Sequence, residues 1–424
     1  MREMKDSGIE WIGEIPKEWS LKKGRYLFVQ RNDKGNDENL QLLSPSQKFG
    51  VIPQSLLEDL TTQTAVKLKE NTDLSTLKTV HKGDFCISLR SFQGGFEYSE
   101  YEGVVSPAYQ IFYKREDLVN DYYKYIFKDS SFISKMNSYT MSLRDGKNIS
   151  YFDFGNTYLP LPTVDEQQQI ADYLDTKCSE IDATAEDIQK EISLLEDYKK
   201  SVITEAVTKG LNPDVEMKDS GIEWIGEIPK HWDIIRIGYI LSEIDRRSIT
   251  GMEESLSVSQ VLGVVPSSQI AVPSTASTMV GQKIVEPGEL VLNKLKAHLG
   301  VCFVSNYKGL VSPDYAVYKA NEKVKSKLLE YVFHTASCIW EFKKYITGVG
   351  QGLSRLYTKD LFRINVALPD MLEQQQIVDY IDSKCSEIDT LIADKKRQLD
   401  ILAEYQKSLI YEYVTGKKEV PVNE

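Results

Sequence analysis

The chain has little of what a disulfide framework, a metal site or a membrane span requires. Its five cysteines are odd in number, widely spread and without a Cys-x-x-Cys pair, so the sequence predicts neither disulfides nor a zinc site. Its four histidines lack metal-ligand spacing. No segment approaches the roughly 20 apolar residues of a membrane span, and the N-terminal residues are too acidic for a signal peptide. We therefore expect a cytoplasmic protein.

An excess of positive charge is also absent. The 424 residues include 51 Lys and Arg against 63 Asp and Glu, a formal net charge of −12. This balance excludes a uniformly basic coat protein for nucleic acid. The length predicts two to four domains, and 41% hydrophobic with 27% charged residues is typical of a globular fold.

An internal repeat organises the chain. Residues 4–19 (MKDSGIEWIGEIPKEW) return as residues 217–232 (MKDSGIEWIGEIPKHW), identical except that His231 stands where the first copy has Glu18. A second block also recurs: EQQQI returns at 373–377, and KCSEID returns at 384–389. The chain therefore consists of two copies of one unit.

The segments between these blocks, residues 20–160 and 233–367, share only short motifs. VSPAY in the first segment matches VSPDY in the second, and KGD matches PGE. Runs rich in β-branched and aromatic residues predict strands at 84–89, 109–113, 288–292 and 315–318. Amphipathic patterns predict helices at 118–137 and 324–345. We expect one mixed α and β fold that carries two different surfaces.

A long heptad pattern follows each variable segment. In residues 171–206 apolar residues recur every seventh position, with a second series three or four residues away. Proline precedes each helix and glycine follows it: Pro162 and Gly210, then Pro369 and Gly416. Such a seam requires a partner helix, and the second copy provides one.

The sequence therefore predicts an α+β fold in which two mixed α/β domains are separated by two long antiparallel helices. These helices form a coiled coil about a pseudo-twofold axis, with the variable domains at opposite ends. The alternative is that the helices bind other proteins and not each other. The repeated Trp-rich blocks, with Trp11, Trp19, Trp224 and Trp232, are predicted to anchor each domain to a helix end rather than to stack on a ligand.

The negative charge is unevenly distributed. Residues 165–216 carry a net charge of −9 and residues 368–424 carry −5, whereas residues 20–160 carry +1 and residues 233–367 carry +4. The acidity lies on the helical regions and the variable segments are neutral to basic.

Loops at matched positions of the variable segments hold side chains suited to base edges. Arginine bonds to guanine and glutamine to adenine in bidentate fashion, and nearby glycines permit close approach. A single basic residue is more often a solvated surface charge, so the matched recurrence carries this prediction. The candidates are Gln47, Arg90, Ser91, Gln93, Arg144, Lys147, Gln260, Asn293, Lys294, Lys296, His298 and Arg355. No catalytic constellation accompanies them, and we expect no active site in this chain.

With these motifs the sequence resembles the specificity subunit of a type I restriction-modification system, over the whole chain. The resemblance rests on WIGEIP at 11–16 and 224–229 and on LPxxxEQQQI at 161–170 and 368–377, together with the VSPxY motifs and the KCSEID helices.

The resemblance implies a non-catalytic subunit whose two target-recognition domains each bind one half of a bipartite, gapped double-stranded DNA site. It implies long helices that space the domains and bind two methyltransferase (modification) subunits. S-adenosylmethionine-dependent adenine methylation and ATP-driven translocation and cleavage would belong to modification and restriction subunits. No cofactor is expected in this chain; S-adenosylmethionine, ATP and Mg²⁺ are expected on the partners.

The predicted domains follow the repeat. The first recognition domain spans 1–160, the first spacer helix 161–210, the linker with the second recognition domain 211–367, and the second spacer helix with a tail 368–424. The alternative function is a stand-alone coiled-coil scaffold whose variable domains bind proteins. A third class, a self-sufficient nuclease or methyltransferase, would require methyl transfer or cleavage by the chain alone.

Overall fold

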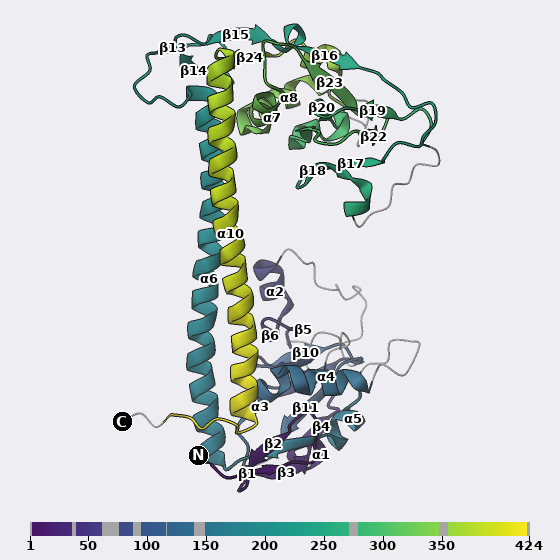
Figure 1. Cartoon of the computed structure of the whole chain (residues 1–424). Coiled ribbons are helices and arrows are strands. Elements are labelled where there is room, and N and C mark those ends of the chain that lie inside the picture. The colour runs from purple at the N-terminus through teal and green to yellow at the C-terminus, as the bar shows by residue number, and fades with distance from the viewer. Residues whose placement is uncertain are drawn as a thin grey trace. The chain divides into compact units, whose positions relative to one another are not determined.

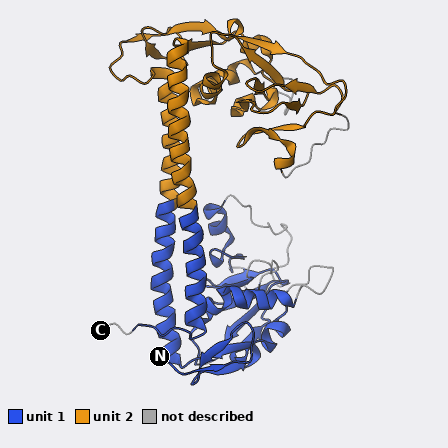
Figure 2. Ribbon diagram, viewed as in Figure 1, with its two compact units in different colours: residues 1–188, 397–424 blue, residues 189–396 orange. Residues whose placement is uncertain are grey.

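The computed structural model describes residues 2–35, 40–61, 76–87, 95–115, 117–139, 149–270, 279–346 and 355–421. The chain divides into two units, residues 1–188 with 397–424 and residues 189–396 (Figure 2). Each unit contains one α/β domain and half of each of two long helices. We call residues 2–161 the first domain and residues 217–368 the second domain.

The first domain is built on a four-stranded antiparallel sheet (Figure 1). The strand order is β4 (Phe28–Arg31), β11 (Gln110–Lys114), β8 (Phe85–Ile87) and β9 (Phe96–Tyr98). Two-stranded sheets surround it: β1 (Met4–Asp6) with β2 (Glu14–Pro16), β3 (Ser20–Lys23) with β12 (Tyr158–Leu161), β5 (Leu43–Ser46) with β6 (Gly50–Pro53), and β7 (Lys78–Val80) with β10 (Gly103–Val105). Its helices are α1 (Gly24–Leu27), α2 (Gln54–Leu60), α3 (Asn120–Lys128), α4 (Ser130–Ser138) and α5 (Tyr151–Asn156).

The second domain repeats this strand order. Its four-stranded sheet runs β16 (Leu241–Ile244), β23 (Ala316–Ala320), β20 (Leu290–Leu292) and β21 (Cys302–Val304). Its two-stranded sheets are β13 (Met217–Asp219) with β14 (Glu227–Pro229), β15 (Asp233–Arg236) with β24 (Asn365–Leu368), β17 (Leu256–Ser259) with β18 (Gly263–Pro266), and β19 (Lys283–Val285) with β22 (Gly309–Val311). Its helices are η3 (Ile237–Tyr239), η4 (Ser267–Gln269), η5 (Lys294–Leu299), α7 (Ser326–His334), α8 (Ala336–Tyr345) and α9 (Thr358–Leu361).

The four predicted strands are confirmed as β8, β11, β20 and β23, but each predicted amphipathic helix is two helices. Asp129 ends α3 and caps α4, since its carboxylate accepts the N–H groups of Ser131 and Phe132. Thr335 does the same between α7 and α8. A side chain that satisfies the free N–H groups of a new helix turns the chain at that point. The prediction of single helices was therefore wrong at these two residues.

The two domains fill the same architecture with different cores. In the first domain Phe28 contacts Phe85 and Phe112 edge-on, at ring-centroid distances of 5.9 and 5.3 Å. At the corresponding sheet positions of the second domain lie Leu241, Leu290 and Tyr318, all buried. Shared topology with different core packing explains why the intervening segments align only at short motifs.

The long helices are α6 (Val164–Lys209) and α10 (Met371–Val414), which pack together in each unit. The joining contacts are Tyr173 with Tyr413 and Gln406 with Asp182 in the first unit, and Lys395 with Glu191 and Lys199 with Asp389 in the second. Within each unit the partner on α10 falls in number as the residue on α6 rises. The predicted antiparallel coiled coil is confirmed, and we call α6 and α10 the helical frame.

The Trp-rich blocks join each domain to the frame. Trp19 and Trp232 are 2% and 1% exposed, and their indole N–H groups donate to Glu166 and Glu373 at the start of the long helices, at 2.8 and 3.2 Å. The glutamates belong to the repeated EQQQI block. The blocks are therefore structural anchors, as predicted.

Candidate nucleic-acid interface

The candidate residues lie in three places along each domain, and five of them are outside the described residues. These five are Arg90, Ser91, Gln93, Arg144 and Lys147. Gln47 and Gln260 occupy matched hairpin turns, between β5 and β6 and between β17 and β18, and both are exposed. The main-chain carbonyl of Gln47 accepts a hydrogen bond from Lys128 Nζ at 2.9 Å, which fixes the turn against α3.

In the second domain Asn293 shapes the loop in which it lies. Its side chain is 6% exposed, and its carbonyl oxygen accepts the N–H groups of Leu295 and Lys296 at 3.1 and 3.3 Å. It therefore caps η5 and directs the residues that follow. Lys296 is exposed on this helix, and His298 is half-buried.

Two candidate loops of the second domain meet. The Leu356 N–H donates to the main-chain carbonyl of Lys294 at 3.1 Å, and the Arg355 guanidinium pairs with Asp314 at 3.3 Å. Partial burial, with the charge of Lys283 nearby, lowers the pKa of Lys294. The structure thus brings Lys294 and Arg355 beside the VSPDY motif, which supplies Asp314. Asp314 was missed as a site residue although its motif was noted.

A matched basic pair in each domain was also missed. Lys34 and Lys78 lie opposite each other on a short antiparallel bridge in the first domain, and Arg247 and Lys283 do so in the second. Lys34 and Arg247 are exposed, whereas Lys283 is 3% exposed. The available signal was a lysine five residues before the glycine of KGD and of PGE.

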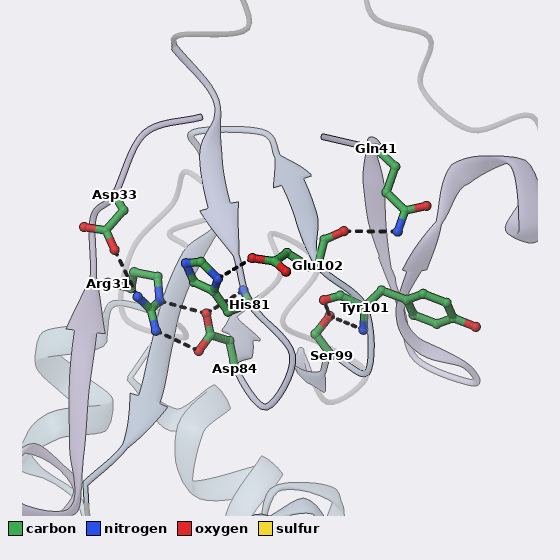
Figure 3. A network of polar contacts seen from close by, with 8 residues as sticks. All are labelled: Arg31, Asp33, Gln41, His81, Asp84, Ser99, Tyr101 and Glu102. Carbon is green, nitrogen blue, oxygen red and sulfur yellow. Dashed lines mark hydrogen bonds and ion pairs between the residues drawn. The ribbon is translucent and has the colours of Figure 1, made fainter. Parts of the chain in front are cut away.

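A polar network holds the loop that carries Lys34 (Figure 3). The Arg31 guanidinium donates to both carboxylate oxygens of Asp84, at 2.8 and 3.3 Å, and pairs with Asp33 at 3.0 Å. Asp84 also accepts a hydrogen bond from the main-chain N–H of His81 at 2.9 Å, and Nδ1 of the His81 ring lies 2.7 Å from Glu102 Oε1. Burial raises the pKa of Asp84, because desolvation outweighs these donors. The network links β4 to the turn before β8.

The same figure shows a second part of the network. Gln41 donates to the main-chain carbonyl of Glu102 at 3.0 Å, and Ser99 bonds to both the N–H and the C=O of Tyr101. The strand ends around the Lys34 loop are therefore fixed by side chains as well as by the sheet.

The second domain has a corresponding network in which only the outer pair exchanges its charges. Glu289 stands where Asp84 does, bonds to Arg246 and accepts the Glu286 N–H at 2.9 Å. Glu286 in turn pairs with Lys308 at 2.9 Å. In the first domain the acid of the outer pair is Glu102 and its partner is His81. In the second domain the acid, Glu286, stands at the position of His81, and Lys308 stands at that of Glu102. The matched KGD and PGE motifs are explained as carboxylates that clamp an arginine and cap a turn.

Within the described ranges, no cluster of His, Cys, Asp and Glu has the geometry to hold a metal ion. No helix in the part of the chain that the structure describes is both long and apolar enough to cross a membrane.

Sequence comparisons agree with this architecture. Residues 14–194 match the model of the type I restriction modification DNA specificity domain. The chain is 24% identical to the putative type I restriction enzyme MjaX specificity subunit of Methanocaldococcus jannaschii, over 96% of both chains. It is 23% identical to the type I restriction enzyme MjaVIII specificity subunit of the same organism, over 80% of each.

Solved structures share the fold. A chain from work described as the structural basis underlying complex assembly and conformational transition of the type I R-M system gives a TM-score of 0.69 at 14% identity. It covers 95% of this chain and 99% of that one. The HsdS subunit from Thermoanaerobacter tengcongensis gives a TM-score of 0.55 at 16% identity, over 95% and 98%.

Two domains of one fold, each anchored to one half of a helical pair, define a duplicated recognition module. The loops that carry the candidate residues differ in sequence between its two halves. Residues 14–194 match the DNA specificity domain of type I restriction-modification systems, and the chain is similar over nearly its whole length to a specificity subunit of such a system. The function that this similarity supports is that of a DNA specificity subunit of such a system.

Proposed function

We propose that the first and second domains each read one half of a bipartite, gapped double-stranded DNA site, held by the helical frame. The observation that supports this most is the duplication: the same strand order, basic pair and anchor occur twice, while the candidate loops differ. Linking two half-site contacts in one chain raises the affinity for DNA that carries both. The domain boundaries at residues 160, 210 and 367 belong to this proposal.

Base contacts are assigned to the candidate loops. In the second domain Lys294 and Arg355 converge from separate loops, and the fork of an arginine suits the O6 and N7 atoms of guanine. The remaining assignments are Gln260, Lys296 and His298 there, with Asn293 shaping the loop, and Gln47, Arg90, Ser91, Gln93, Arg144 and Lys147 in the first domain.

Contacts to the phosphates of the DNA backbone are assigned to the basic pairs. Lys34 and Arg247 occupy equivalent exposed positions in domains whose other loop residues differ. Contacts to phosphate carry no sequence information, so the same residue type can serve both half-sites. The small positive charge of each domain provides little counterion release, and we expect the isolated chain to bind DNA weakly.

The helical frame is assigned to two modification subunits. Leu194 and Tyr198 on α6 are 68% and 55% exposed, and their repeat equivalents on α10, Ile401 and Tyr405, are 61% and 54% exposed. Apolar pairs one turn apart on an acidic helix are typical of a protein contact. Two equivalent patches fit two copies of one partner. S-adenosylmethionine is assigned to these partners, and ATP and Mg²⁺ to the restriction subunits.

The test is selection from randomised double-stranded DNA by the chain together with its modification subunit. Enrichment of two short motifs with a fixed gap is the expected outcome. If no motif is enriched even at low salt, the domains bind proteins and the scaffold alternative holds. Methyl transfer by the purified chain alone would instead revive the enzyme alternative.

Substitution of Lys34 or Arg247 by alanine should weaken binding to all DNA sequences alike. The loss of one phosphate contact lowers the slope of log affinity against log salt by about one. Substitution of Lys294 should instead relax the sequence preference of one half-site. Both effects are measured by titrations at several salt concentrations on matched and mutated sites. A loss confined to one sequence on substitution of Arg247 would contradict its assignment to phosphate.

A further inference from the structure

In the first unit, helix α3 is held against α6 by two polar contacts. The amide oxygen of Gln167 accepts the main-chain N–H of Val119 at 2.9 Å, at the residue before α3. The phenol of Tyr125, six residues further on, donates to Asp175 Oδ1 at 2.6 Å. We call the first contact the glutamine grip and the second the tyrosine latch.

The second unit repeats both contacts. Gln374 accepts the main-chain N–H of Lys325 at 2.9 Å, at the residue before α7, and Tyr331 donates to Asp382. The spacing is the same as in the first unit, six residues on the short helix and eight on the long one.

This spacing fixes an angle as well as a position. Eight residues of α-helix separate grip and latch by about 12 Å along the long helix. One contact would act as a pivot, whereas two contacts this far apart also prevent rotation of the domain on its helix.

The glutamine grip does not depend on which residue supplies the N–H group. It binds a main-chain N–H, so valine at 119 and lysine at 325 serve equally. Gln167 and Gln374 are 0% and 1% exposed, and each also donates to the carbonyl of the proline before its helix, at 3.0 Å. A buried amide with its hydrogen bonds made is rigid.

The tyrosine latch, by contrast, depends on a side chain of the variable segment. A tyrosine recurs at this position in both domains. Two buried hydrogen bonds of α3 do not recur, whereas the ion pair of Asp121 with Lys124 recurs with exchanged charges as Lys327 with Glu330. Tyr122 donates to the carbonyl of Val414 and Tyr123 to that of Pro160, yet their equivalents in α7 are Leu328 and Leu329. Recurrence among residues that otherwise differ indicates a shared task.

The chemistry of the latch keeps the donor protonated. Burial, reinforced by the carboxylate of Asp175, raises the pKa of Tyr125 far above its ordinary value. Tyr125 and Asp175 also line a cavity of about 460 Å³. The latch of the first unit therefore lies at the edge of an open groove.

We propose that the two tyrosine latches are positioning contacts that set the angle of each recognition domain on its helix and so define the gap between half-sites. This rests on the proposed reading of a bipartite site. Tyr125 and Tyr331 act without touching DNA, through the domains that they orient.

The experiment uses the full complex with its modification subunits and measures methylation of sites whose gap is longer or shorter by one or two base pairs. In Tyr125→Phe the preference for the native gap over its neighbours should fall about 3- to 10-fold, the factor that corresponds to one lost hydrogen bond. Tyr331→Phe should do the same, and Asp175→Asn, which keeps an acceptor, should stay close to wild type.

Tyr123→Phe is the matched control, because it removes a buried hydroxyl bond from the same helix without touching the latch. It should leave the gap preference unchanged. The result that overturns the proposal is a native gap preference in Tyr125→Phe. In that case Tyr125→Phe and Tyr123→Phe would lower thermal stability or total methylation alike, as two merely structural hydrogen bonds would. If the wild-type complex itself enriches no gapped motif, the proposed function fails instead.

Discussion

Substitution of Trp19 by alanine is expected to lower the free energy of unfolding of the first unit by about 3 to 5 kcal/mol. The indole is 2% exposed, lies under the Arg2 guanidinium and donates to Glu166, so its loss leaves a large cavity and removes one of the two donors to this half-buried carboxylate, the other being Arg2. Trp232→Ala should have the equivalent effect on the second unit. Urea denaturation of the full chain, followed by circular dichroism, measures both.

Trp340 provides the internal control for this prediction. It is 51% exposed and lies outside the repeated blocks, with Lys344 over its ring. Its substitution by alanine should cost less than about 1 kcal/mol. Equal losses at Trp19 and Trp340 would show that the repeated blocks do not anchor the domains.

A second large effect is expected at Gly416, where the end of α10 meets the first Trp-rich block. Its φ is +71°, and a Cβ added there would lie 2.5 Å from the Cδ of Pro16 and 2.9 Å from the ring of Trp19. Gly416→Ala should therefore cost about 2 to 4 kcal/mol, from the left-handed conformation and the overlap together. The midpoint of thermal unfolding reports this loss.

Gly8 separates the two contributions. Its φ is +67°, but nothing lies within 4 Å of an added Cβ. Gly8→Ala should cost only the conformational part, about 1 to 2 kcal/mol. If the two substitutions cost the same, the contact between Gly416 and the Pro16 turn contributes nothing to stability.

The parts of the fold that depend on local spacing could be predicted. A heptad seam and a glycine after a helix are local patterns, and the structure confirms both the paired helices and the positive φ of Gly210 and Gly416. The break at Asp129 is also local, since an Asp followed by two serines inside a helical pattern is an N-cap signal. It was missed because the amphipathic pattern continued across it.

The contacts that shape the candidate interface could not be predicted, because they join residues far apart in sequence. Arg31 and Asp84 are separated by 53 residues, and the loops of Lys294 and Arg355 approach only through the folded sheet. The basic pairs depend on a β-bridge whose two sides have different offsets between the copies. A single lysine at a matched position carries too little information to reveal such a bridge.

The exchanged charges of the polar networks have a consequence for how such chains evolve. A genetic crossover inside a domain, between the turn before β8 and the strand β10, would place Glu286 opposite Glu102, or His81 opposite Lys308. The first product places two carboxylates together, and the second places an imidazole beside an ammonium group. Each original domain has an acid paired with a base at this position. A crossover in the nearly identical Trp-rich or EQQQI blocks separates no such pair. The network therefore favours exchange of each domain as a whole over exchange within a domain.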